Sequence, residues 1–181
     1  LEQAYSLKKQ HPHWLLIGER NEMKPEGFDY GNSPYLIKDA EVRDKTIIHT
    51  TSSGTQGIVN AVHAEELITG SFVNAGAIAR YIKSKNPQYV SLCCMGYATL
   101  YPTEEDTFCA EYIRALITGE AYNYEHAIET IKVTSGSRFF DNKPHAPVED
   151  FYMCTKKNIF NFVLQVNKNK DNTFNITRFD I

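Results

Sequence analysis

The sequence lacks the marks of a membrane protein and of a nucleic-acid-binding protein. No apolar run in its 181 residues approaches the ~18–20 residues that a transmembrane helix needs. Its 19 Lys and Arg residues are outnumbered by 22 Asp and Glu residues, which gives a net charge of −3. Because binding of nucleic acid requires clustered positive charge, we expect neither a nucleic acid nor a membrane among its partners.

Cysteine is scarce and is not arranged for metal binding. The four cysteines lie at positions 93, 94, 109 and 154, and no two of them form a Cys-x-x-Cys pair. This spacing argues against a structural zinc site. Buried free thiols in a reducing compartment explain the pattern best, so we expect a cytoplasmic protein.

The familiar catalytic and nucleotide-binding motifs are also missing. The sequence contains no G-x-x-x-x-G-K-[ST], no G-x-G-x-x-G and no H-E-x-x-H, and no Ser-His-Asp arrangement can be recognised. Among the six histidines, His145 lies on a predicted loop, whereas His49 lies in a predicted strand and His63 at a helix end. Any chemistry must therefore come from a less common set of residues.

What is present is an alternation of short apolar strands with amphipathic helices, typical of one α/β domain spanning residues 1–181. Strands are predicted at 14–17, 46–50 and 89–94, and helices at 2–9, 34–40, 55–63, 74–83, 104–118 and 124–132. This order predicts a three-layer α/β/α sandwich with a largely parallel or mixed sheet, the three apolar strands lying near its centre. The rhythm changes after residue 160, where residues 162–166 and 173–177 flank a polar turn and predict a C-terminal β-hairpin.

The most informative segment is Thr-Thr-Ser-Ser-Gly-Thr-Gln-Gly at residues 50–57. It connects a predicted strand to a predicted helix with small hydroxyl and glycine residues. Backbone N–H groups and the positive end of a helix dipole can bind an anion in such a loop, here at Ser53, Gly54 and Thr55. An ordinary turn with Thr55 as the helix N-cap explains the same pattern.

Other polar residues follow the predicted strands, where α/β proteins tend to bind ligands. Glu19 and Arg20 come after the first strand; they suit a metal ion and an anion respectively, or form a surface ion pair. Asn32 and Ser33 either face a ligand or cap the next helix, and the same choice holds for Asn74.

Acidic residues open the predicted helix at 104–118. Glu104, Glu105 and Asp106 provide the carboxylate oxygens that Mg²⁺ prefers. Thr103 and Asp106 also have the spacing of a capping box, and acidic residues suit a first helical turn without any metal. The sequence leaves both interpretations open.

Taken together, these motifs resemble the 2-phosphosulfolactate phosphatases of coenzyme M biosynthesis and their bacterial relatives. The resemblance covers residues 1 to about 161. It rests on motifs in the family's order: Gly-Glu-Arg at 18–20, Gly-Phe-Asp-Tyr-Gly-Asn-Ser-Pro at 27–34, the loop at 50–57, Gly-Ser-Phe-Val-Asn at 70–74 and Glu-Asp at 105–106.

The resemblance implies an α/β/α fold and Mg²⁺-dependent hydrolysis of a phosphate ester on a small sulfonated hydroxy acid. It leaves a homo-oligomer open. Its implied site has three parts. Glu19 and Asp106, with Glu105, hold Mg²⁺; Arg20 and the backbone of residues 53–55 grip phosphate or sulfonate oxygens; Asn32 and Ser33 orient the substrate.

One departure from the family qualifies this expectation. Members open with a strand ending in Asp and followed by Arg-Ala-Thr-Thr, and the 181 residues contain no such segment. We therefore expect a domain incomplete at its N-terminus, with one strand position near the site unfilled and feeble hydrolysis by these residues alone. Two alternatives stay open: a non-catalytic anion-binding member or fragment of the fold, and a phosphate-binding transferase.

Overall fold

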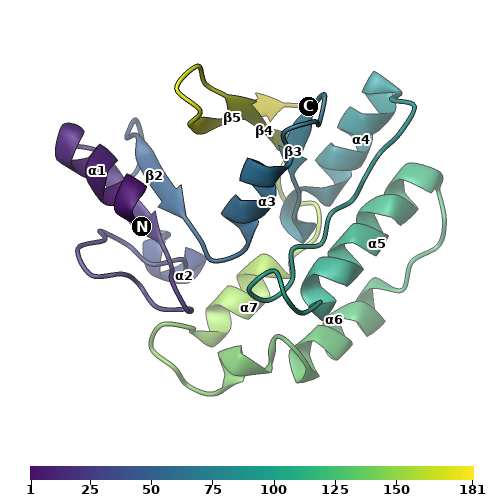
Figure 1. The fold of residues 1–181 in the computed structure, drawn as a ribbon. Helices are drawn as coiled ribbons and strands as arrows, with labels where there is room; N and C mark the ends of the chain where they lie inside the picture. The colour runs from purple at the N-terminus through teal and green to yellow at the C-terminus, as the bar shows by residue number, and fades with distance from the viewer.

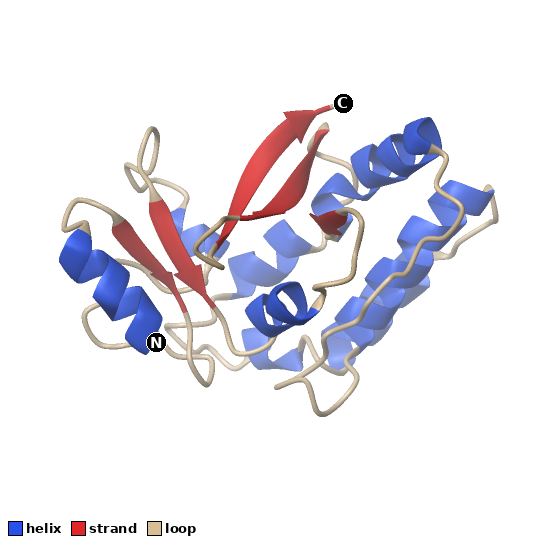
Figure 2. Ribbon diagram, turned by 45° about the horizontal axis from the view of Figure 1, so that its top comes forward, coloured by secondary structure: helices blue, strands red, loops and turns tan.

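A computed structural model describes residues 1–181 and has the mixed α/β architecture expected from the sequence (Figure 1). Seven α-helices and two 3-10 helices accompany five strands. The strands form two separate sheets, one of two parallel strands and one of three antiparallel strands. Figure 2 shows the parallel pair beside the N-terminal helix and the antiparallel strands near the C-terminus.

The parallel sheet pairs β1 (Leu15–Gly18) with β2 (Ile47–Thr50). Helix α1 (Glu2–Gln10) packs against this pair, and α2 (Pro34–Ile37) lies in the connection between the strands. A small core made of Ala4, Leu16, Phe28 and Ile48 joins these elements. The predicted strands at 14–17 and 46–50 are confirmed, but their predicted position near a sheet centre is wrong, because each has only the other as its neighbour.

The antiparallel sheet has the order β3–β4–β5. Its strands are β3 (Leu67–Thr69), β4 (Phe162–Lys168) and β5 (Phe174–Asp180). β4 and β5 form the predicted C-terminal hairpin, which is confirmed. Val163 on β4 is completely buried, because this side of the hairpin packs against the helices of the larger core.

The remaining helices, except α3, pack around the larger core, which includes Phe72, Ile78, Tyr112, Ile131 and Phe151. In chain order, the remaining helices are α3 (Gly54–Asn60), η1 (Phe72–Asn74), α4 (Ala75–Lys85), α5 (Glu104–Thr118), α6 (Tyr124–Val133), η2 (Ser137–Phe140) and α7 (Val148–Cys154). α4 and α5 pack side by side (Figure 1). None of these helices combines the length and the apolar character needed to span a bilayer.

The prediction of a central strand at residues 89–94 is wrong. This segment is irregular and belongs to neither sheet. Tyr89 is 83% exposed and Val90 is 45% exposed, whereas a central strand would bury both. A run of apolar residues becomes a strand only where neighbouring backbone completes its hydrogen bonds, and this segment instead lies along α5.

One helix was not predicted, and the expectation for the cysteines needs correction. The sequence did not reveal α7, whose seven residues are too few for a clear helical period. The four thiols are free, as expected, but Cys93, Cys94 and Cys154 are exposed rather than buried. The first two are exposed because the segment carrying them is not a buried strand.

Candidate functional site

Six of the ten predicted site residues line a cavity of about 240 Å³ between the two cores: Glu19, Asn32, Ser33, Ser53, Glu105 and Asp106. Its walls come from the loops after β1 and β2, from the start of α5, from η2 and from α7. The lining includes Glu19, Asn21, Glu22, Asn32, Ser33, Ser52, Ser53, Gly96, Tyr97, Thr103, Glu105, Asp106, Arg138, Phe139, His145 and Asp150. We call this space the acidic cavity, because five of these side chains are carboxylates.

Glu19 connects the loops that follow the two parallel strands. Its Oε1 accepts a hydrogen bond from the Ser52 backbone N–H at 2.5 Å, and its Oε2 accepts from the Ser52 hydroxyl at 2.9 Å. The Glu22 backbone N–H also donates to Oε2, at 3.0 Å. The parallel register of β1 and β2 makes this possible, because it ends both strands at the same edge with Gly18 opposite Thr50.

Gly18 is required at the end of β1. Its φ is +149°, and a Cβ at this position would lie 2.0 Å from the backbone oxygen of Thr50. The Glu19 N–H donates to that same oxygen at 3.1 Å. Only a glycine allows the two strand ends to approach so closely, and this approach places Glu19 in the cavity wall.

Arg20 lies near the same loop but does not line the acidic cavity. Its Nη1 donates to the Thr51 carbonyl oxygen at 2.9 Å and its Nη2 donates to the Thr50 hydroxyl at 3.1 Å. The guanidinium therefore holds the loop after β2 in place. Its predicted contact with a bound anion stays a prediction.

The loop at 50–57 contributes Ser52 and Ser53 to the cavity, but neither Gly54 nor Thr55. The helix begins at Gly54 with Ser53 as its N-cap, so the interpretation of Thr55 as the N-cap is wrong. Thr55 instead bonds back to Thr51: its N–H donates to the Thr51 hydroxyl at 3.2 Å, and its hydroxyl donates to the Thr51 carbonyl oxygen at 3.0 Å. These bonds shape the loop from within.

Ser33 has both a capping role and a place in the cavity wall. It is the N-cap of α2 and accepts a hydrogen bond from the Leu36 N–H at 3.2 Å, as its position before Pro34 predicts. Its hydroxyl donates to Asp150 Oδ1 at 2.8 Å. Asp150 also accepts from the Tyr35 N–H at 2.9 Å, so this buried carboxylate fixes α2 to α7.

Asn32 contacts His49, a histidine with a lowered pKa. The Asn32 Oδ1 lies 3.3 Å from His49 Nε2. Desolvation lowers the pKa of His49, and the charge of Glu19 opposes this effect only in part. His49 is therefore mainly neutral at pH 7, and its Nε2–H can donate to Asn32.

The start of α5 places two carboxylates in the cavity. Asp106 Oδ2 accepts a hydrogen bond from the Gly96 N–H at 2.6 Å. Thr103 is the N-cap, but its side chain makes no capping bond, so the predicted capping box is not formed. The Asp106 carboxylate instead ties the loop before α5 to the cavity wall.

Glu105 is the unusual carboxylate of the site. Its Oε2 is buried and has no hydrogen-bond partner, although the residue lines the acidic cavity. A buried carboxylate oxygen without a donor is costly, because it has lost its water and gained nothing in return. A cation placed in the cavity would provide the missing partner.

Asn74 lies away from the acidic cavity. Only 3% of it is exposed; its Oδ1 accepts from the Ser71 hydroxyl at 2.8 Å and its Nδ2 donates to the Phe162 carbonyl oxygen at 3.2 Å. It occupies the N-cap position of α4 without a side-chain capping bond. Its contacts connect the start of α4 to β4, and its predicted contact with a ligand stays a prediction.

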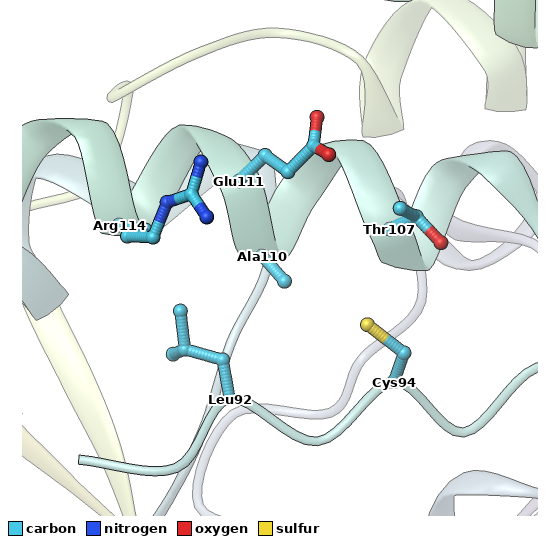
Figure 3. A pocket seen from close by; sticks show the side chains of 6 residues that line it. All are labelled: Leu92, Cys94, Thr107, Ala110, Glu111 and Arg114. Carbon is cyan, nitrogen blue, oxygen red and sulfur yellow. The ribbon is translucent and has the colours of Figure 1, made fainter. Parts of the chain in front are cut away.

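A second cavity, of about 210 Å³, lies between residues 92–94 and α5. Figure 3 shows Leu92 and Cys94 pointing toward the helix. Desolvation raises the pKa of the Cys94 thiol, and the nearby charge of Asp106 raises it further. The same causes raise the pKa of Cys109 to about 12, so neither thiol is an activated nucleophile.

Sequence reasoning missed several residues of the acidic cavity, among them Glu22, Arg138 and Asp150, and gave His145 no role. Asp150 meets Ser33 across 117 residues of chain, and Arg138 meets Glu22 across 116. No local pattern around Arg138 or Asp150 indicates a partner so far away. The position of His145 on a loop between prolines was the one signal available.

Comparison with known proteins identifies the family. The family model described as 2-phosphosulpholactate phosphatase matches residues 1–169. A protein of Bacillus subtilis (strain 168) named "Probable 2-phosphosulfolactate phosphatase" is 32% identical over 169 residues, covering 91% of this chain and 73% of that protein. Proteins with the same name from Thermotoga petrophila and Caldanaerobacter subterraneus are 37% and 43% identical, over 61% and 51% of this chain.

These two shorter matches span 48% and 39% of the relatives' own lengths. The match in Bacillus subtilis is long enough to include every carboxylate of the acidic cavity. The family model covers the same residues. The chain therefore belongs to the 2-phosphosulfolactate phosphatase family.

Proposed function

We propose that this protein is a phosphatase that hydrolyses the phosphate ester of a small sulfonated hydroxy acid, 2-phosphosulfolactate, with the help of Mg²⁺. The observation that carries the proposal is that Glu19, from the loop after β1, meets Glu105 and Asp106, from the first turn of α5, around one cavity. Membership in the family, and the names of the relatives, support the choice of substrate.

The charge of the cavity supports the need for a cation. Five carboxylates line it, and the basic residues among its lining are Arg138 and His145. A substrate with phosphate, carboxylate and sulfonate groups is strongly anionic, so it would be repelled unless positive charge were added. A divalent metal ion supplies that charge.

The donor set suits Mg²⁺. This ion prefers oxygen ligands and is often held by only one or two protein carboxylates, with water and substrate phosphate completing its coordination. No three His, Cys, Asp or Glu side chains converge closely enough to hold a metal by themselves. The unpartnered Oε2 of Glu105 fits one direct contact, and Glu19 and Asp106 supply further carboxylate oxygens in the same cavity.

When bound, Mg²⁺ would neutralise charge that develops on the phosphoryl oxygens. The protein's own groups do the positioning. The hydroxyls of Ser52 and Ser53 and the amide of Asn32 line the cavity and can hydrogen-bond oxygens of the substrate. Ser33 is already committed to Asp150, so we propose that it orients the substrate by fixing the wall that carries Asn32.

A binding protein without activity is the main alternative. It would be favoured if the carboxylates turned away from the cavity into capping roles, but Thr103 and Asp106 form no capping box and Glu105 caps nothing. The alternative of a transferase would require room for a second substrate. The acidic cavity, at about 240 Å³, lies below the usual range of about 300–1,000 Å³ for ligand pockets, so it suits one small substrate and leaves little room for a second.

The proposal is tested by measuring phosphate release by the protein expressed from its complete gene. The substrates are 2-phosphosulfolactate and glycerol 2-phosphate, each with Mg²⁺ present. We expect turnover of 2-phosphosulfolactate. We expect much slower turnover of glycerol 2-phosphate, because it has neither the sulfonate nor the carboxylate. Absence of turnover with both substrates would contradict the assignment.

A further inference from the structure

Arg138 is the one permanently charged cation that lines the acidic cavity. It lies on η2, 116 residues along the chain from its partner Glu22. Its guanidinium carbon lies 5.0 Å from the centre of the Phe139 ring, which also lines the cavity. No role for this residue follows from the motifs of the sequence.

The backbone that carries Arg138 is held firmly. The Gly136 N–H donates to the Ile131 carbonyl oxygen at 2.8 Å, and a Cβ on Gly136 would lie 2.8 Å from that oxygen and 2.9 Å from the Phe151 ring. Phe140, two residues beyond Arg138, packs edge-to-face on Phe151 at 5.2 Å. Arg138 therefore projects from a fixed element anchored in the larger core, as a recognition residue should.

The partner of Arg138 is replaceable. Its Nη1 lies 3.1 Å from Glu22 Oε1, and the two side chains are 38% and 41% exposed. Ion pairs as exposed as this one stabilise proteins little, so breaking it costs little. Glu22 lies on the loop after β1 and also lines the cavity, so the carboxylate occupies a place that an anionic ligand could take.

We propose that Arg138 recognises the sulfonate group of the substrate and that Glu22 is the internal anion which the sulfonate displaces. A guanidinium offers two parallel N–H donors, which match two oxygens of a sulfonate. The inference rests on the proposed function, in which the metal ion takes the phosphate. The remaining anionic groups then need a different counterion, and Arg138 is the permanent one available.

The test compares two substrates that differ only in the sulfonate. The first is 2-phosphosulfolactate, and the second is 2-phospholactate, which keeps the phosphate and carboxylate. For Arg138→Gln we expect kcat/KM on 2-phosphosulfolactate to fall at least about tenfold, since a hydrogen bond between charged groups is lost. On 2-phospholactate we expect less than about a threefold change, because the group that Arg138 reads is absent.

Glu22→Gln separates recognition from a structural role. If Arg138 reads the sulfonate, removing its competitor charge raises kcat/KM on 2-phosphosulfolactate or lowers KM, the opposite of the effect of Arg138→Gln. If the pair only supports the fold, both variants lose activity on both substrates. Arg114→Gln is the matched control, because Arg114 is an exposed arginine on α5 that lines the other cavity.

Equal losses on the two substrates for Arg138→Gln, or no loss on either, would overturn the inference.

If the unmodified protein turns over neither ester, the proposed function fails, and calorimetry with sulfolactate and lactate then decides the role of Arg138. Tighter binding of sulfolactate that is lost in Arg138→Gln supports the inference. Equal affinity of the unmodified protein and the variant for sulfolactate overturns it.

Discussion

The Ser33 hydroxyl donates a 2.8 Å hydrogen bond to Asp150 across 117 residues of sequence. The bond joins the N-cap of α2, near the small core, to the first turn of α7, near the larger core. Ser33 and Asp150 are 5% and 3% exposed, so the bond is shielded from water. It sets how the two halves of the acidic cavity face each other.

Removing either partner should destabilise the protein. Ser33→Ala deletes the cap of α2 and leaves Asp150 with one donor fewer, and we expect a loss of about 1–2 kcal/mol in the free energy of unfolding. Asp150→Asn should cost a similar amount. In a double-mutant cycle measured by urea unfolding, the two changes should be coupled by at least about 0.5 kcal/mol.

Ser84→Ala is the control for this cycle, because the exposed Ser84 donates only to the Tyr81 carbonyl oxygen of its own helix. It should change stability by less than about 0.5 kcal/mol. Strictly additive effects of Ser33→Ala and Asp150→Asn would show that the bond does not connect the two halves energetically.

Gly18→Ala should disrupt the site by separating the two strand ends. A Cβ would lie 2.0 Å from the Thr50 backbone oxygen, and backbone cannot move aside as a flexible side chain can. We expect the free energy of unfolding to fall by at least about 3 kcal/mol, which is above the range for ordinary overpacking. Denaturant unfolding of the variant and the unmodified protein measures this difference.

Gly119→Ala is the matched control for this glycine. It also has a positive φ, +82°, but a Cβ there meets nothing within 4 Å. Only the backbone strain of a left-handed residue remains, which is about 1–2 kcal/mol. Similar losses for the two variants would mean that the close approach to Thr50 is unimportant.

Asp29 should make stability depend on pH in the acidic range. Burial acts to raise the pKa of Asp29, but a 2.7 Å hydrogen bond from the Leu16 N–H and the ion pair with Lys8 outweigh it and hold the pKa below its ordinary value. The unfolded chain therefore takes up this proton at a higher pH than the folded protein does. The stabilisation is complete above the ordinary pKa of about 4 and is lost as the pH falls through the lower, folded-state pKa.

Asp29→Asn removes this dependence. The variant should be less stable than the unmodified protein at pH 7, and the difference should shrink at pH 3, as urea unfolding at the two pH values would show. A difference that grows as the pH falls would have the wrong sign for a lowered pKa.

Glu105→Gln should weaken Mg²⁺ binding by about 10–100-fold or more, since replacing even a group that only supports a metal's direct ligands has that effect. The reason is that Oε2 of Glu105 is a buried carboxylate oxygen of the cavity wall with no hydrogen-bond partner. Calorimetric titration with MgCl₂ measures the effect. Glu104→Gln is the control, since Glu104 precedes Glu105 on α5 but does not line the cavity; equal weakening by both changes would point to a general charge effect.

The sequence indicates much of the fold because most of its signals are local. Ser33 before Pro34 predicts the start of α2, and Gly119 and Asn86 end α5 and α4 in left-handed conformations. Local signals give the wrong prediction for residues 89–94. An apolar run forms a strand only if another strand lies beside it, and its own residues do not determine whether one does.

The residues of the acidic cavity likewise include some that the sequence indicates and some that it does not. Glu19 can be predicted, because residues that follow parallel strands lie at one sheet edge. Glu105 and Asp106 follow no strand in the structure, and it is the motif shared with the family that indicates them. Arg138 and Asp150 cannot be predicted, because each reaches the cavity through tertiary packing and makes its contact with a residue more than 100 positions away.

The most direct test of the proposed activity is the rate of phosphate release from 2-phosphosulfolactate as Mg²⁺ is removed with EDTA and then restored. Unmodified protein, Glu105→Gln and Glu104→Gln are compared at the same substrate concentration. We predict that release stops without Mg²⁺ and returns with it, and that Glu105→Gln needs about 10–100-fold more Mg²⁺ than Glu104→Gln to reach half its maximal rate. Release that continues unchanged in EDTA, or equal Mg²⁺ requirements for the two variants, would contradict a magnesium-dependent phosphatase site in the acidic cavity.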